Sequence, residues 1–323
     1  MTRQVHLPPH LLDGPFAVTE ARQLGVSHTT LRRKAFEAPF YGVRRRAATP
    51  ATIRNQCEAA AQVLPPSAVF SHEAAAGLLD LPVRRGASRT VHLGTVIDVT
   101  VPDHLPQPRG RGIRGHRSLL RPEDVVDLGG IRVTSPIRTW CDLATRWSLD
   151  ELVMLGDAIA AGERDQFGGP RRLGSSPRPR SPSLDDLRAA AAAWGARRGS
   201  RVLRQAVDLV RVGVDSPPET DLRLLVVRAG LPEPVVNLDI WDGLTWIHRP
   251  DLSWPRWRVG VDYDGEHHFT GGEARLRRDS SRREDLRSIG WLLPVVTSSD
   301  LYGRPLIVLR RIGQALREHG AAW

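Results

Sequence analysis

The chain has 323 residues, of which 41% are hydrophobic and 25% are charged, and this composition excludes an intrinsically disordered protein. Its formal net charge of +10 favours a polyanionic partner such as nucleic acid, unless a GC-rich genome has simply enriched arginine. Two cysteines exclude a disulfide framework and a cysteine-based zinc site, and the lack of a long apolar run or a signal-peptide core predicts a cytoplasmic protein without membrane contact.

Residues 1–50 predict a winged helix-turn-helix. The segment VTEARQLGVSHTTLRRKAF contains two short helical stretches around a Gly-Val turn, and Ser27 is placed to cap the second stretch through its side-chain oxygen. The segment PFYGVRRRAATP then predicts a short hairpin, the wing. The residues expected to contact DNA are Arg32, Arg33 and Lys34 on the second helix and Arg44 and Arg45 on the wing. The alternative is a small helical hairpin packed on the next domain.

Residues 51–162 predict a small α+β domain. A helix is expected after Ser71, and a second one after Ser135 with Pro136 in its first turn. Isolated histidines of this region (His72, His92 and His116) are expected to be structural or surface residues without a chemical role. Residues 163–183, which include GGPRRLGSSPRPRSPS, are rich in Gly, Pro, Ser and Arg. That composition cannot bury a core and predicts a flexible basic linker.

Residues 184–323 predict a compact α/β domain in which a mixed sheet is flanked by helices. One helix should begin at Ser216 in SPPETDLRLLVVRAGLP, and a last helix should span about 305–319. Between them lie strand-like runs, namely PVVNLDIW, LTWIHRPDLSW, WRVGVDYDG and, after a charged helix, WLLPVVT. Two of these runs should form a hairpin that turns near Pro255.

Three aspartates gather in this hairpin. Side chains alternate between the two faces of a strand, so Asp262 and Asp264 should share a face, and the hairpin turn could bring Asp251 beside Asp262. Carboxylates so close destabilise the fold unless a cation joins them. Ligation by oxygen atoms alone suits Mg²⁺ or Mn²⁺. The spacing therefore predicts a metal site formed by Asp251, Asp262 and Asp264.

The Pro-Asp pair, followed after ten residues by Asp-Tyr-Asp, resembles the core of PD-(D/E)xK nucleases. That family also carries a glutamate on the preceding helix, and Glu219 fits this place. The segments SPPETDLRLLVVRAGLPEPVVN, RPDLSWPRWRVGVDYDGEHHF and RRDSSRREDLRSIGWLLPVVTSSDL resemble, over residues 205–320, the Vsr-like group, which is similar to very-short-patch-repair endonucleases. The resemblance implies a restriction-endonuclease-like fold and metal-dependent DNA hydrolysis. SHEAAAGLLDLP and GIRVTSPIRTWCDLA resemble, over about residues 15–162, AbiEi-type antitoxins and transcriptional regulators.

The chain departs from the wider superfamily at the third motif position. The superfamily has a lysine there, whereas this chain has Asp264 and no lysine after Lys34. The resemblance to the Vsr-like group implies that a histidine takes over proton transfer, and the candidates are His268, preferred, and His267. Arg282 and Arg283 could hold the scissile phosphate, although the alternative is a solvated charged helix.

These observations lead to competing functional hypotheses. The first is a metal-dependent endonuclease that hydrolyses DNA phosphodiester bonds and is targeted by an N-terminal DNA-binding module. The second is a non-catalytic DNA-binding regulator, or a protein like the antitoxins of type IV toxin-antitoxin pairs. An RNA-directed or toxin-like nuclease is a third. The sequence leaves open the preferred site on DNA, a homodimeric state and a partner toxin.

Overall fold

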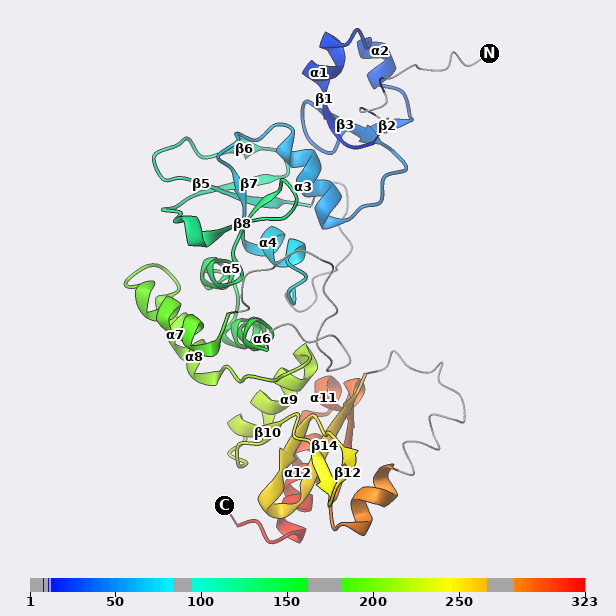
Figure 1. Cartoon of the computed structure of the whole chain (residues 1–323), viewed down its shortest axis with the longest axis vertical. Coiled ribbons are helices and arrows are strands. Elements are labelled where there is room, and N and C mark those ends of the chain that lie inside the picture. Colours follow the sequence, from blue (N-terminus) through cyan, green and yellow to red (C-terminus); the bar gives the residue numbers. More distant parts are fainter. Residues whose placement is uncertain are drawn as a thin grey trace. The chain divides into compact units, whose positions relative to one another are not determined.

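The computed structural model describes residues 8, 11, 13–83, 95–161, 182–265 and 282–322. The chain divides into two compact units. The first contains 1–155 with 189–204, and the second contains 156–188 with 205–323. Helices and several mixed sheets make up the described residues (Figure 1), and this confirms the predicted α/β class. No helix in the described ranges is long and apolar enough to cross a membrane.

The first unit begins with a small sheet and two short helices. The sheet has the order β1-β3-β2, with β1 at Phe16–Ala17, β2 at Phe36–Glu37 and β3 at Val43–Arg46. Between its strands lie α1 (Val18–Gln23) and α2 (His28–Leu31). Ser27 caps α2 as predicted, because its side chain accepts a hydrogen bond from the Thr30 amide at 3.2 Å. The antiparallel pairing of β2 with β3 forms a hairpin whose first strand lies before the predicted segment 39–50.

A six-stranded sheet of order β6-β7-β5-β4-β9-β8 dominates the rest of the first unit. Its strands are β4 (Val69–Phe70), β5 (Ile97–Val101), β6 (Arg109–Gly110), β7 (Ile113–Arg117), β8 (Val125–Asp127) and β9 (Arg132–Thr134). The pairs β5–β7 and β4–β9 are parallel, whereas the others are antiparallel. All five residues of β5 are buried, so this strand lies at the centre of the core.

Three helices accompany this sheet: α3 (Ile53–Ala61), α4 (His72–Leu78) and α5 (Pro136–Leu143). Apolar residues of α3 and α4 share one core cluster with the strands, whereas α5 contacts α4. Ser135 caps α5 as expected, with its side chain 3.4 Å from the Arg138 amide. Ser71 precedes α4 as expected, but its side chain makes no capping bond to that helix. It bonds the side chains of His72 and Thr100 instead.

The helices α6 (Leu149–Ala160), α7 (Leu184–Ala193) and α8 (Ser200–Leu209) follow, and each has residues in both units. Ser183 immediately precedes α7, and its side chain and its amide both donate hydrogen bonds to the Asp186 carboxylate. Residues 163–181 of the predicted basic linker lie outside the described residues.

The second unit is built around a four-stranded sheet of order β10-β13-β14-β15. Its strands are β10 (Val235–Val236), β13 (Leu252–Trp254), β14 (Val259–Asp264) and β15 (Val295–Thr297). The pair β14–β15 is parallel and the other pairs are antiparallel, so the sheet is mixed as predicted. The helices are α9 (Pro217–Arg228), α11 (Ser298–Gly303) and α12 (Pro305–Glu318), with a further helical stretch at 282–288. One apolar cluster joins α9, α11 and α12 to the sheet.

The predicted run LTWIHRPDLSW forms two strands that belong to different sheets. Its first half is β12 (Thr245–His248), which pairs with β11 (Ile240–Asp242) in a two-stranded sheet. Its second half is β13. Asp251 therefore lies just before β13, rather than at the end of a strand. The hairpin turn itself is where the sequence predicts it, because a 3-10 turn at Pro255–Trp257 connects β13 to β14.

Candidate functional site

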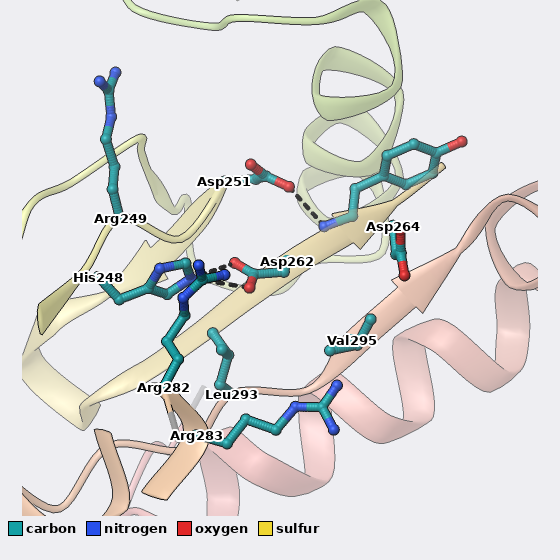
Figure 2. A pocket seen from close by; sticks show the side chains of 10 residues that line it. His248, Arg249, Asp251, Asp262, Asp264, Arg282, Arg283, Leu293 and Val295 are labelled. Carbon is teal, nitrogen blue, oxygen red and sulfur yellow. Dashed lines mark hydrogen bonds and ion pairs between the residues drawn. The ribbon is translucent and has the colours of Figure 1, made fainter. Parts of the chain in front are cut away.

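A pocket of about 230 Å³ lies at one end of the β13–β14 hairpin (Figure 2). Its lining comes from the end of β12 and the residues after it, the hairpin, β15 with the residues before it, and the beginning of the helical stretch at 282–288. The lining residues are His248, Arg249, Asp251, Asp262, Tyr263, Asp264, Arg282, Arg283, Leu293 and Val295. The three predicted metal ligands and both predicted phosphate-binding arginines of this domain thus meet at one pocket.

The strand register explains how the aspartates reach the pocket. Leu252 pairs with Val261 across the hairpin, so Asp251 lies next to Asp262 at the open end. On the other side of β14, Asp262 pairs with Val295 of β15. Val261 points to the buried core, whereas Asp262 is half-buried and Asp264 is exposed. This alternation confirms that the core and the carboxylates occupy opposite faces of β14.

Asp251 is the most perturbed acid of the pocket. One of its carboxylate oxygens, Oδ2, accepts a hydrogen bond of 2.6 Å from the Tyr263 amide. Burial, reinforced by the negative charges of Glu219 and Asp262, raises the pKa of Asp251 to about 8. A carboxyl with this pKa is stabilised in its charged form by a cation, because the cation removes the repulsion between the acids.

Glu219 lies in the first turn of α9 and is buried. Its carboxylate accepts hydrogen bonds from the Ser216 hydroxyl at 2.6 Å, the Asp215 amide at 3.0 Å and the Asn237 side-chain amide at 2.8 Å. Burial nevertheless raises the pKa of Glu219. Glu219 does not line the pocket itself, but its negative charge contributes to the raised pKa of Asp251.

His248 lines the pocket together with Arg249, and the sequence reasoning gave neither residue a role. The Nε2 atom of His248 lies 2.9 Å from both carboxylate oxygens of Asp262, and its side chain is buried (Figure 2). A charged carboxylate only accepts hydrogen bonds, so Nε2 carries the proton that is shared with Asp262. The signal was present in the sequence, since His248 stands three residues before Asp251 in the run HRPD. The predicted proton-transfer residues, His267 and His268, lie outside the described residues.

Three arginines add positive charge to the pocket. The Arg249 side chain is anchored by the Asn237 carbonyl at 2.9 Å and by Asp215 at 3.3 Å. Arg282 and Arg283 line the opposite wall (Figure 2), at the start of the helical stretch. The pocket therefore combines carboxylates that can hold a cation with guanidinium groups that can hold a phosphate.

The basic residues of the N-terminal helix pair divide into two groups. Arg32, Arg33 and Lys34 are exposed, although they lie just after α2 rather than within it. Arg44 turns back on its own unit and donates to the Leu31 carbonyl at 2.9 Å. Arg45 is buried in an ion pair with Glu37. The first group is exposed at the surface, whereas the two arginines of the hairpin bond groups of the same unit.

A second polar cluster lies in the first unit and contains His72, Asp98 and His116. One ligand atom from each residue lies within 4.8 Å of the others, and among the described residues no other group of three His, Cys, Asp or Glu is so close. The three carboxylates of the hairpin pocket therefore do not all lie this close to one another. Sequence reasoning treated the two histidines as isolated, but their rings stack with centroids 4.1 Å apart. The third histidine of this group, His92, lies outside the described residues.

The electrostatics of this cluster are strongly perturbed. Burial, together with the charges of His116 and Arg146, lowers the pKa of His72 to about 3. Burial opposes ionisation of Asp98, but hydrogen bonds from His116 and Arg146 outweigh it and hold the pKa of Asp98 below its usual range. His72 is therefore a neutral imidazole beside a charged carboxylate at neutral pH.

The chain was compared with protein families, curated proteins and solved structures. It is similar to two uncharacterized proteins of Mycobacterium tuberculosis, MT2308 of strain CDC 1551 and Rv2248 of strain H37Rv. Each is 28% identical over 121 residues, which cover 37% of this chain. The match spans 44% of the length of these relatives. No family model and no solved structure matches the chain.

Proposed function

We propose that the chain is a metal-dependent endonuclease that hydrolyses DNA phosphodiester bonds in the pocket of the second unit. The observation that carries the proposal is the juxtaposition of Asp251 and Asp262 beside three arginines. A phosphodiester substrate is anionic, and its cleavage by a metal-activated water needs both kinds of group in one place.

The donor set fits a hard divalent cation. Asp251, just before β13, and Asp262, on β14, both offer carboxylate oxygens to the pocket, and Asp264 lies on the same face of β14 as Asp262. The raised pKa of Asp251 reflects burial first and then repulsion by Glu219 and Asp262, which a cation would relieve. Oxygen ligands of this type favour Mg²⁺ or Mn²⁺. When bound, such an ion would polarise a phosphodiester oxygen and lower the pKa of its water.

The remaining residues would orient the metal-binding carboxylates and bind the substrate. His248 fixes the direction of the Asp262 carboxylate through its Nε2 proton. Three hydrogen bonds hold the Glu219 carboxylate, and its negative charge acts on Asp251. Arg282 and Arg283 would bind the scissile phosphate, and His268 remains the proposed proton-transfer residue of the adjoining segment. The exposed basic residues after α2 would bring the protein to DNA as part of a winged helix-turn-helix.

The proposal is tested by nicking of supercoiled plasmid by the full chain with Mg²⁺, with Mn²⁺ and with EDTA. Conversion of the plasmid to open-circular or linear form with either metal, and none with EDTA, is expected. A labelled RNA of matched sequence in the same assay distinguishes an RNA-directed nuclease. Tight, salt-dependent DNA binding without cleavage under any metal would contradict the proposal and favour a non-catalytic regulator.

A further inference from the structure

The cluster of His72, Asp98 and His116 in the first unit is independent of the proposed nuclease site. The sheet explains how two of its members meet. In the parallel pair β5–β7, Thr100 lies opposite His116 and Asp98 lies opposite Arg114. Asp98 and Thr100 are two residues apart on one strand, so Asp98 and His116 project from the same face. His72 reaches them from the beginning of α4.

The backbone at His72 is unusual. Its φ angle is 53°, in the left-handed region that residues other than glycine rarely adopt. Such conformations persist only where the surrounding structure imposes them, and they are concentrated at functional sites. The His72 Nδ1 atom lies 3.0 Å from the Ser71 hydroxyl, which accepts a hydrogen bond of 2.8 Å from Thr100. This chain of contacts fixes the orientation of the His72 ring.

The hydrogen bonds around His116 cannot all be satisfied. Its Nε2 atom lies 2.8 Å from Asp98 Oδ1 and 3.0 Å from Arg146 Nη2. A guanidinium only donates and a carboxylate only accepts. If Nε2 carries a proton, it faces the donor of Arg146, and if it does not, two lone pairs face each other. A cation held between Nε2 and Oδ1 would remove this conflict.

We propose that His72, Asp98 and His116 form a binding site for a divalent transition-metal ion such as Zn²⁺. Two imidazoles and one carboxylate form a donor set that Zn²⁺ accepts with one coordination position left open. Imidazole ligands also separate this site from the oxygen-rich pocket of the second unit, which suits Mg²⁺. Ser71 would supply the outer hydrogen bond that orients a metal-binding histidine.

Arg146 is the nearer of two arginines that pair with Asp98 Oδ1, and it is the internal competitor for this site; Arg114 Nη1 lies 3.7 Å from the same oxygen. The Nη2 atom of Arg146 lies 2.8 Å from Asp98 Oδ1, where the metal would bind, while its Nη1 atom lies 2.8 Å from Glu73 Oε2. Metal binding would displace Nη2 from Asp98, and the bond to Glu73 would keep the guanidinium nearby. The cluster can reach solvent on this side, because the His116 side chain is 24% exposed and that of Arg146 is 21% exposed.

The site is tested by titrating Zn²⁺ into the metal-free full chain in competition with a chromophoric chelator. His116→Ala should lose one tightly bound Zn²⁺ per chain, whereas His104→Ala should not, because His104 is an exposed histidine of the same unit. Asp262→Ala should also keep this ion, which separates the result from the fate of the proposed nuclease. Circular dichroism verifies that each variant is folded.

Arg146→Gln provides a second arm that leaves all three ligands in place. It should bind Zn²⁺ about 10-fold or more tightly than the wild type, since it removes a competing cation. Equal Zn²⁺ binding by the wild type and by His116→Ala would overturn the proposal, as would a folded wild type that binds none. Unchanged or weaker binding by Arg146→Gln would overturn the role of Arg146 as competitor.

Discussion

The Nε2 atom of His248 lies at 2.9 Å from both carboxylate oxygens of Asp262. Because the contact is symmetric, it holds the plane of the carboxylate as well as its position. His248 comes from β12, whereas Asp262 comes from the central strand β14 of another sheet. A residue outside the sheet thus orients the acid that would hold the metal, and this relationship leads to the first prediction.

His248→Ala should raise the Mg²⁺ concentration needed for half-maximal plasmid nicking by about 10- to 100-fold, the usual effect of losing a group that orients a metal ligand. His248→Gln should recover part of this loss, because its amide can donate to Asp262. The measurement is the nicking rate as a function of Mg²⁺ concentration, with His104→Ala as the control. A reduced maximal rate at an unchanged Mg²⁺ requirement would contradict the orienting role.

In the absence of metal, Asp251→Asn should be more stable than the wild type, and this difference in the free energy of unfolding should grow as the pH rises. The pKa of Asp251 is about 8 in the folded chain but about 3.9 when the chain is unfolded. The folded state therefore binds more protons between these values, and the wild type loses stability as the pH increases from about 4 to 8. Asparagine cannot ionise and keeps an acceptor for the Tyr263 amide.

The free energy of unfolding of both proteins, measured in EDTA from pH 5 to pH 8, provides the check. The advantage of the variant should grow with pH and shrink when Mg²⁺ is added. A constant difference across this range would mean that Asp251 is not the buried, repelled carboxyl described above.

Arg283→Ala should weaken DNA binding uniformly across sequences. Arg283 is an exposed residue that lines the pocket, so its proposed partner is a phosphate rather than a base. Loss of one phosphate contact lowers the slope of log affinity against log salt by about 1. Arg287→Ala is the matched control, because Arg287 is exposed in the same helical stretch but does not line the pocket. Identical salt slopes for the two variants would refute the phosphate contact.

Asp157→Ala should destabilise the second unit by about 3–5 kcal/mol, as expected when one partner of a buried ion pair is removed. Asp157 and Arg223 are both almost completely buried, with Oδ2 and Nη2 3.2 Å apart. The Thr220 hydroxyl also donates to Oδ2 at 2.7 Å. Denaturant unfolding followed by tryptophan fluorescence measures the loss, and a change below about 1 kcal/mol would show that solvent reaches the pair.

Local rules in the sequence predicted much of the fold. Ser27 and Ser135 start helices because a capping hydroxyl acts within three residues. The turn at Pro255 is equally local. The alternation of β14 also placed Asp262 on the face opposite the core, because that alternation depends on one strand alone.

Contacts between distant segments account for what the sequence did not predict. The Asp157–Arg223 pair joins residues 66 positions apart, and the stacking of His72 on His116 depends on the register of a parallel pair. Arg45 looked like a surface cation in its basic run, but pairing of β2 with β3 turns it inward to Glu37. His248 was overlooked because the hydrophobic pattern predicted a single strand where the structure has two, β12 and β13, in different sheets.

The most direct test of the proposed metal-dependent cleavage is a single-turnover assay with saturating protein and Mg²⁺ that compares the wild type with Asp262→Ala. Asp242→Ala is the matched control, because Asp242 is an exposed aspartate on β11 of the same unit. Asp262→Ala is expected to bind DNA still but to cleave it at least about 100-fold more slowly, while Asp242→Ala is expected to cleave at the wild-type rate. Equal cleavage by the wild type and Asp262→Ala would contradict the assignment of the site.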